Sequence, residues 1–186
     1  MTSITIEETK LKGVFLLTPN SFEDQRGVFS RLFCAQEMRE IMGDRRIVNM
    51  NQSTNVHAGT VRGLHYQEPP YGEMKQVRCT KGRIFDVAVD IRKGSPTFLQ
   101  WVGFELTEEN KQTLVIPEGF AHGFQALTQG ATVSYLVTAF FNKDADRGLH
   151  PEDPRLAIQW PLKPEHMSAK DSGKPFIDES FEGVIL

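Results

Sequence analysis

Three short strings in the chain contain side chains that could carry acid–base chemistry. Residues 62–67 read RGLHYQ and contain His65, and residues 117–124 read PEGFAHGF and contain His122. Residues 168–171 read SAKD and end in Asp171. An imidazole has a reference pKa of about 6.5, so it can take up and return protons near neutral pH. His65 is therefore a candidate general base, and the alternative is a structural histidine. For SAKD the alternative is a charged surface turn.

A tyrosine and several cations complete the set of reactive side chains. Period-two alternation places Val133, Tyr135 and Val137 on one face of a predicted strand, so the phenol could lie inside a barrel. A buried phenol can donate a proton or serve as a structural hydrogen-bonding group. Four cations could form a phosphate receptor if they surround a cavity, although surface positions are the alternative for each; they are Arg26, Arg62, Lys75 and Arg78.

The histidines also resemble the metal ligands of the cupin superfamily. In cupins, two His at positions i and i+2, then a Glu and a distant His, hold the metal. Here His65, Glu73 and His122 match three of these ligand types, but Gln67 replaces the second His. Glutamine is a poor ligand for transition metals. The sequence therefore favours a site without a metal, and a metal-dependent oxygenase remains an alternative.

Short strand-like runs dominate the elements that must position these side chains. Residues 84–91 alternate with period two, which predicts a half-buried strand with Asp86 and Asp90 on its other face. In residues 60–67, alternation places Val61, Gly63, His65 and Gln67 on one face. Further strands are predicted at residues 3–7, 13–18, 28–33, 47–52, 75–80, 97–106, 112–116, 122–127 and 132–140.

Helices are a minor part of the predicted fold. Residues 35–42 have helical spacing and end at Gly43, a plausible C-cap, and a shorter helix is predicted at residues 108–111. Many strands with little helix predict a mainly β sandwich or barrel of the jelly-roll type, whose interior can hold a small ligand. No linker or repeat divides the chain, so one domain spanning residues 1–186 is expected.

Composition excludes several classes of function. The net charge of −3 over 186 residues argues against a general nucleic-acid binder. The two cysteines, Cys34 and Cys79, have no CxxC spacing and are expected to be reduced thiols of a cytoplasmic protein. The first residues lack the apolar region of a signal peptide, and no run is long and apolar enough to span a membrane.

Seven strings in a fixed order resemble the dTDP-4-dehydrorhamnose 3,5-epimerase family. They are DQRG, RGLHYQ, KQVRC, FDVAVDIRKGSPTF, ENKQTLVIPEGFAHGF, SYLVT and SAKD, and the resemblance covers the chain from about residue 16 to residue 175. The resemblance implies a double-stranded β-helix (cupin) enzyme that forms a homodimer and needs no metal or other cofactor. It implies inversion of C3 and C5 of a dTDP-4-keto-6-deoxyhexose, by proton removal next to the C4 ketone and reprotonation on the opposite face.

The resemblance also implies a role for individual residues. His65 would be the base, Asp171 its carboxylate partner and Tyr135 the acid. The implied substrate-binding residues are Arg26, Asn51, Gln52, Arg62, Lys75, His122 and Lys170. Departures from the family pattern include Arg31 where relatives often have Glu, and Phe140–Phe141 where tyrosines are common. A single-centre epimerase, a 3,4-ketoisomerase and a cupin that only binds its ligand therefore remain alternatives.

Overall fold

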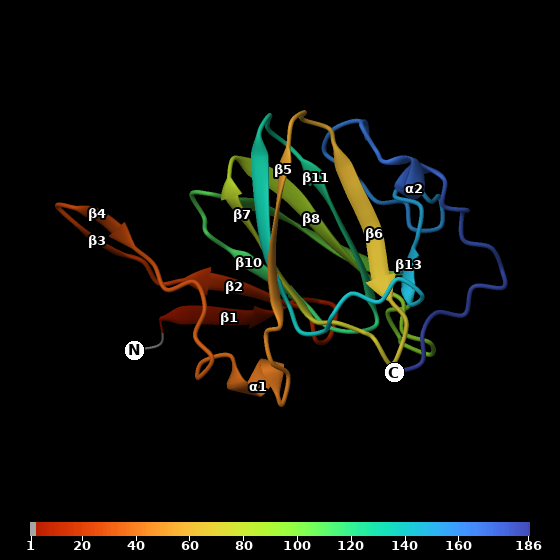
Figure 1. Cartoon of the computed structure of the whole chain (residues 1–186), viewed down its shortest axis with the longest axis horizontal. Helices are drawn as coiled ribbons and strands as arrows, with labels where there is room; N and C mark the ends of the chain where they lie inside the picture. Colours follow the sequence, from red (N-terminus) through yellow and green to blue (C-terminus); the bar gives the residue numbers. More distant parts are fainter. Residues whose placement is uncertain (1–2) are drawn as a thin grey trace.

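Two antiparallel sheets form the body of the molecule, and a small hairpin projects from it (Figure 1). The computed structural model describes residues 3–186. The described residues contain thirteen strands and two short helices, so the prediction of a mainly β fold is confirmed. None of the described helices is long and apolar enough to cross a membrane.

The larger sheet has six strands, and the second sheet has five. The six-stranded sheet has the order β1 (Ile4–Glu8), β2 (Phe15–Pro19), β10 (Thr113–Ile116), β7 (Lys75–Lys81), β12 (Ala131–Val137) and β5 (Asn49–Asn55). The five-stranded sheet has the order β13 (Asp146–Gly148), β6 (Val61–Gln67), β11 (Phe120–Ala126), β8 (Arg83–Asp90) and β9 (Trp101–Thr107). The projecting hairpin pairs β3 (Phe22–Asp24) with β4 (Gly27–Phe29).

The main apolar core lies between the two sheets. It joins side chains such as Val77 and Val133 of the six-stranded sheet to Ile84 and Phe124 of the five-stranded sheet. Tyr135 lies two residues after Val133 on the same strand and packs only against the margin of this core. Along β12 the interior is thus filled by apolar side chains at Val133, whereas at Tyr135 it opens into a cavity.

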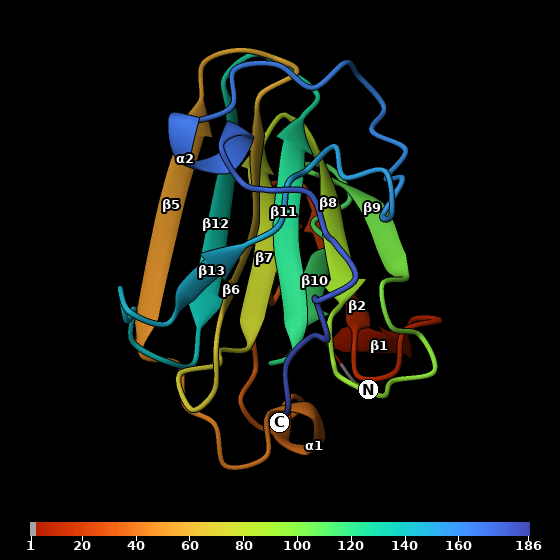
Figure 2. The same ribbon diagram turned by 90° about the vertical axis from the view of Figure 1, so that its right-hand side faces the viewer.

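Strand β8 is buried on both faces, which corrects the prediction of a half-buried strand. Ile84 and Ala88 pack in the core between the sheets, whereas Val87 and Val89 pack against the C-terminal segment, residues 149–186. This segment crosses the outer face of the five-stranded sheet (Figure 2). Period-two alternation alone identifies one apolar face, but it cannot show that a distant segment covers the other face.

The two aspartates of β8 are consequently buried as well. The carboxylate of Asp90 accepts hydrogen bonds from Arg92, Ser95 and Thr97. Burial alone would raise the pKa of Asp90, but these hydrogen bonds outweigh it and lower the pKa to about 2. Asp90 is therefore an ionised anchor of the turn that follows β8, and Asp86 belongs to the site described below.

A bulge in β6 sets which side chains enter the interior. His122 of β11 pairs with His65, whereas Phe124, only two residues further on, pairs with Arg62. Three steps on β6 thus match two steps on β11, so Arg62 and His65 face the same side. Simple alternation predicts Gly63 rather than Arg62 on the face of His65, and the bulge corrects that prediction.

Gly63 makes this bulge possible, and its replacement should be costly. Its φ is +120°, and a Cβ there would lie 2.5 Å from the Cα of Gly123. We expect Gly63→Ala to lower the free energy of unfolding by about 3 kcal/mol, because left-handed strain and overpacking add. Denaturant titration measures this loss. Gly94→Ala is the control, because Gly94 has φ +76° but no heavy atom within 4 Å of the added Cβ; equal losses in the two variants would contradict the argument.

The helices differ from the prediction in length and place. Helix α1 (Arg39–Met42) is the last turn of the predicted residues 35–42, and Gly43 ends it as expected, with φ +55° and its N–H bonded to Arg39. Residues 108–110 of the second predicted helix form a turn, because the Oγ1 of Thr107 accepts backbone N–H bonds from Glu109 and Asn110. Helix α2 (Ala169–Ser172) instead lies in the SAKD string, where the side chain of Ser168 caps it.

Candidate active site

The cavity between the sheets has two lobes that share four side chains. The larger lobe, about 490 Å³, contains Arg62 and His122 and is called the arginine lobe here. The smaller lobe, about 340 Å³, contains Asn49 and Asn51 and is called the asparagine lobe. The side chains that line both lobes are His65, Lys75, Tyr135 and Lys170. Four of the predicted site residues thus lie where the two lobes meet.

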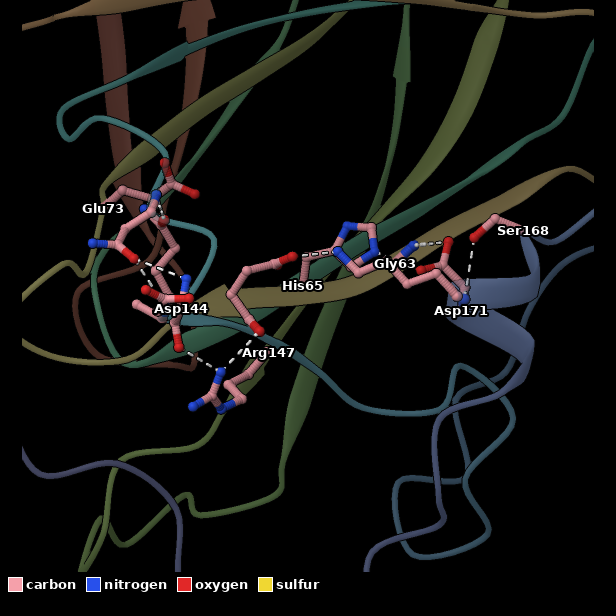
Figure 3. A network of polar contacts seen from close by, with 12 residues as sticks. Gly63, His65, Glu73, Asp144, Arg147, Ser168 and Asp171 are labelled. Atoms are coloured by element: carbon pink, nitrogen blue, oxygen red, sulfur yellow. Dashed lines mark hydrogen bonds and ion pairs between the residues drawn. The ribbon is translucent and has the colours of Figure 1, made fainter.

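His65 and Asp171 form a close pair at this junction. The Nε2 atom of His65 lies 2.6 Å from Oδ1 of Asp171, although the two residues come from β6 and α2 (Figure 3). The backbone N–H of Gly63 donates to Oδ2 of Asp171 at 3.4 Å, and the backbone N–H of Asp171 donates to Oγ of Ser168. Because an ionised carboxylate only accepts hydrogen bonds, the neutral form of this imidazole has its proton on Nε2 and its lone pair on Nδ1. This arrangement is that of a general base.

The environment of Asp171 keeps its carboxylate ionised. Burial alone would raise the pKa of Asp171, but the hydrogen bond and charge of His65, with the bonds from Ser168 and Gly63, lower it below the usual value. The carboxylate can therefore stabilise the imidazolium that forms when His65 takes a proton.

Tyr135 approaches the junction from the other sheet. It lies on β12 of the six-stranded sheet, whereas His65 lies on β6 of the five-stranded sheet. Burial raises the pKa of Tyr135, the charge of Glu73 raises it further, and Arg62 opposes the shift. The phenol therefore stays protonated at neutral pH and can act as an acid across the cavity from the base.

Three cations line the cavity, and each has a partner. The Nε of Arg62 donates to Oδ1 of Asn55 at 2.8 Å. The Nζ of Lys75 lies 3.3 Å from Oε1 of Glu73. Lys170 is paired with Asp146, which also lines the asparagine lobe. These fixed positive charges suit an anionic ligand or a developing oxyanion.

His122 is held by a buried carboxylate on the neighbouring strand. Its Nε2 lies 2.8 Å from Oδ1 of Asp86, whose other oxygen has no hydrogen-bond partner among residues 3–186. Within the same residues, no group of three or more His, Cys, Asp or Glu side chains is arranged to hold a metal ion. Glu73 faces Lys75, so the three ligands of the metal-dependent alternative do not converge in this structure.

The face of β5 that lines the cavity differs in part from the prediction. Asn51 pairs with Tyr135 and lines the asparagine lobe, as predicted. Gln52 points to the opposite face, where it contacts Ser134, so it does not line either lobe. Asn49 and Ser53, two residues to either side of Asn51, line the cavity and were missed. Period-two alternation from Asn51 is the signal that identifies both.

Two of the predicted cations lie away from the cavity. Arg78 points to the outer face of β7, where it donates to the carbonyl of Leu32 and to Oγ1 of Thr113. Arg26 lies in the projecting hairpin, its side chain is 90% exposed, and it pairs with Asp24. The four cations therefore form no single cluster within this chain, and only Arg62 and Lys75 of that set line the cavity.

Comparison with known proteins gives one family for this geometry. The family model described as dTDP-4-dehydrorhamnose 3,5-epimerase matches residues 8–179. A dTDP-4-dehydrorhamnose 3,5-epimerase of Sinorhizobium fredii is 44% identical over 178 residues, which cover 95% of this chain and 89% of that protein. A dTDP-4-dehydrorhamnose 3-epimerase of Streptomyces niveus is 36% identical, with 95% and 85% covered.

A solved structure agrees over almost the whole length of both chains. The dTDP-6-deoxy-D-glucose-3,5-epimerase of Legionella pneumophila, in complex with dTDP-4-keto-L-rhamnose, superimposes with a TM-score of 0.89 and 38% sequence identity. The match covers 98% of this chain and 99% of that chain. The predicted jelly-roll fold and isomerase class are thereby confirmed. Because the family model, the similar sequences and the solved structure all agree over most of its length, the chain belongs to the dTDP-4-dehydrorhamnose 3,5-epimerase family.

Proposed function

We propose that the chain inverts C3 and C5 of a dTDP-4-keto-6-deoxyhexose, with His65 as base and Tyr135 as acid. The observation that carries this proposal is the pair formed by His65 Nε2 and Asp171 Oδ1 at 2.6 Å, in a cavity that Tyr135 lines from the opposite sheet. A binding protein has no need for a base backed by a carboxylate and a facing acid, whereas an epimerase needs both.

The reaction follows from the acidity of hydrogens next to a ketone. His65 takes the hydrogen from C3 or C5 as a proton, and the electron pair left behind delocalises onto the C4 oxygen as an enolate. Lys75 stabilises that oxyanion; a donor of this kind contributes about 3 kcal/mol in comparable sites. Tyr135 then delivers a proton to the same carbon from the opposite face, which inverts it. The steps conserve atoms and electrons without any oxidant or reductant.

The remaining lining residues supply binding and orientation. Arg62 and Lys170 are cations of the cavity wall that can hold a diphosphate, while Asn49 and Asn51 offer amides to the ligand. Phe141 lines the asparagine lobe and is 67% exposed, so its ring is available for stacking on a nucleobase. Binding energy from the nucleotide would align the sugar between His65 and Tyr135.

The active assembly in this proposal is a homodimer. The hairpin of β3 and β4 projects from the body and exposes Phe22, Val28 and Phe29, with 63%, 52% and 65% of each residue accessible (Figure 1). Exposed apolar surface of this kind favours association, and a second copy of the chain is the partner implied by the family. Arg26 lies in the same hairpin, so its substrate-binding role requires the cavity of the partner.

The proposal also places the protein in the cytoplasm, where cysteines stay reduced. Cys34 and Cys79 are free cysteines in the structure.

The direct test is incubation with dTDP-4-keto-6-deoxyglucose in deuterated water, followed by proton NMR. We expect deuterium at both C3 and C5 and a product inverted at both carbons. Inversion at one carbon would establish a single-centre epimerase, the activity named for the Streptomyces niveus relative. Movement of the carbonyl would establish a ketoisomerase, and absence of exchange with this and related nucleotide sugars would refute the proposal.

Tyr135→Phe should separate proton removal from proton return. Because His65 remains, we expect hydrogen exchange into solvent to continue, whereas formation of the inverted product falls by about 100-fold through loss of the acid. Both rates can be followed in the same NMR experiment. Tyr71→Phe is the matched control, since Tyr71 is exposed and lines neither lobe. Full epimerase activity in Tyr135→Phe would reassign the acid.

A further inference from the structure

A buried carboxylate in the cavity wall lies outside the scheme above. Glu73 precedes β7 and lines the asparagine lobe together with His65, Lys75 and Tyr135. The side chains of Glu73 and Lys75 are only 14% and 12% exposed, and their Oε1 and Nζ atoms are 3.3 Å apart. In Figure 3, Glu73 and Asp171 lie to either side of His65. The cavity thus has one carboxylate beside the base and a second beside the cationic wall.

We propose that Glu73 is a positioning residue for the epimerisation: it holds the ammonium of Lys75 toward the C4 oxygen and keeps the facing phenol of Tyr135 protonated. This inference rests on the proposed function, because it assigns Glu73 to the groups that stabilise the enolate and return the proton.

The first part of the proposal follows from the flexibility of lysine. A lysine ammonium is a point charge on a flexible stem of four carbons, so its position depends on what it pairs with. Glu73 is the carboxylate paired with Lys75, and both lie in the same wall, two residues apart. An oxyanion donor acts fully only when it already occupies its place in the transition state. Fixing Lys75 before substrate arrives is therefore a catalytic advantage that a solvent-exposed lysine would lack.

The second part follows from the charges around Tyr135. Burial raises the pKa of Tyr135 first, the negative charge of Glu73 raises it further, and the positive charge of Arg62 lowers it. The other charged or titratable groups that line the cavity around this phenol are His65 and Tyr66 of β6, Lys75 of β7, His122 of β11, Asp146 of β13, and Lys170 and Asp171 of α2, with His166 in the segment before α2. Glu73 is thus an anion placed among several cations, where it opposes ionisation of the acid.

Glu73→Gln removes the charge and keeps the shape. We expect kcat to fall between about 10- and 100-fold, as for a misplaced catalytic group, with KM within about twofold of wild type because the reaction step, not binding, is affected. We also expect the alkaline limb of the kcat profile to move to lower pH, because loss of the anion lowers the pKa of Tyr135. Glu73→Asp keeps the charge on a shorter stem, so it should restore the alkaline limb but not the full kcat.

The titration of Tyr135 can be measured without substrate. The chain has three tyrosines, so the absorbance difference between Glu73→Gln and the double variant with Tyr135→Phe isolates one phenol. The pH midpoint of this phenol in the Glu73→Gln background should lie below its midpoint in the wild-type background, which is given by the difference between wild type and Tyr135→Phe. Glu105→Gln is the control, because Glu105 pairs with Arg83 at the surface and lines neither lobe; it should leave kcat and the phenol unchanged.

The outcomes separate the two proposals. A wild-type protein that exchanges no substrate hydrogen would refute the proposed function. An active wild type whose Glu73→Gln variant keeps its kcat and its phenol titration would refute the role of Glu73 alone. A Glu73→Gln variant that loses kcat, raises KM in proportion and leaves the phenol titration unchanged would show a purely structural residue, and that would also overturn the inference.

Discussion

Replacing His65 with Ala should reduce the exchange of the C3 and C5 hydrogens with solvent by about 10³- to 10⁴-fold, since a positioned general base contributes up to that factor. His65 lines both lobes, and Asp171 is the protein partner of its Nε2 atom. His122, another imidazole of the cavity, is paired with Asp86 and not with Asp171, so it does not replace His65. The measurement is the rate of deuterium incorporation by NMR at saturating substrate.

A control separates loss of the base from loss of the fold. His150→Ala removes an imidazole that packs edge-on against Phe176 and lines neither lobe. This variant should exchange substrate hydrogens at nearly the wild-type rate. Exchange in His65→Ala within tenfold of the control would mean that another group is the base.

Asp171→Asn should be almost as damaging, although it changes a single atom of the side chain. An amide nitrogen donates where a carboxylate oxygen accepts, so the imidazole is driven toward the tautomer with its proton on Nδ1. The loss of orientation and charge in such a dyad costs about 10³- to 10⁴-fold in kcat. Asp178→Asn, in an exposed turn with Ser180, should leave kcat unchanged. Near-normal kcat in Asp171→Asn would contradict the assignment of the dyad.

The same variant has a defined effect on stability as a function of pH. The folded pKa of Asp171 lies below its usual value, so ionised Asp171 stabilises the fold at pH values above the unfolded pKa of about 3.9. This contribution disappears as the pH falls through the folded pKa. The difference in unfolding free energy between wild type and Asp171→Asn should therefore be largest near neutral pH and shrink in acid, as measured by denaturant titration at several pH values.

The strands and the central side chains of the cavity could be predicted because they depend on local pattern and on distinctive strings. Alternation identifies the faces of β12 correctly, so Tyr135 is placed in the interior from sequence. Gly43 is identified as the end of α1 because a left-handed residue suits a C-cap. These features need no knowledge of what packs against them.

The errors arise where a distant contact or a register shift decides the structure. The bulge in β6 brings Arg62 to the face of His65 only because Gly63 and Gly123 approach closely, and alternation along one strand cannot reveal that approach. The sequence assigns both Asn51 and Gln52 to the site although neighbours on a strand face opposite sides, and the register of β5 against β12 places Asn49 and Asn51 toward the cavity. Residues 169–172, which overlap the SAKD string, form a helix because the side chain of Ser168 caps them and the carboxylate of Asp171 pairs with His65.

The route by which Asp171 reaches the site has a consequence for how the protein is made. His65 and Asp171 are 106 residues apart in the chain, and the segment of residues 149–186 must dock on the outer face of the five-stranded sheet to bring them together. All thirteen strands precede this segment in the chain, so they leave the ribosome before this carboxylate does. Turnover therefore reports that the segment has docked, and a product truncated before α2 would lack the carboxylate of Asp171.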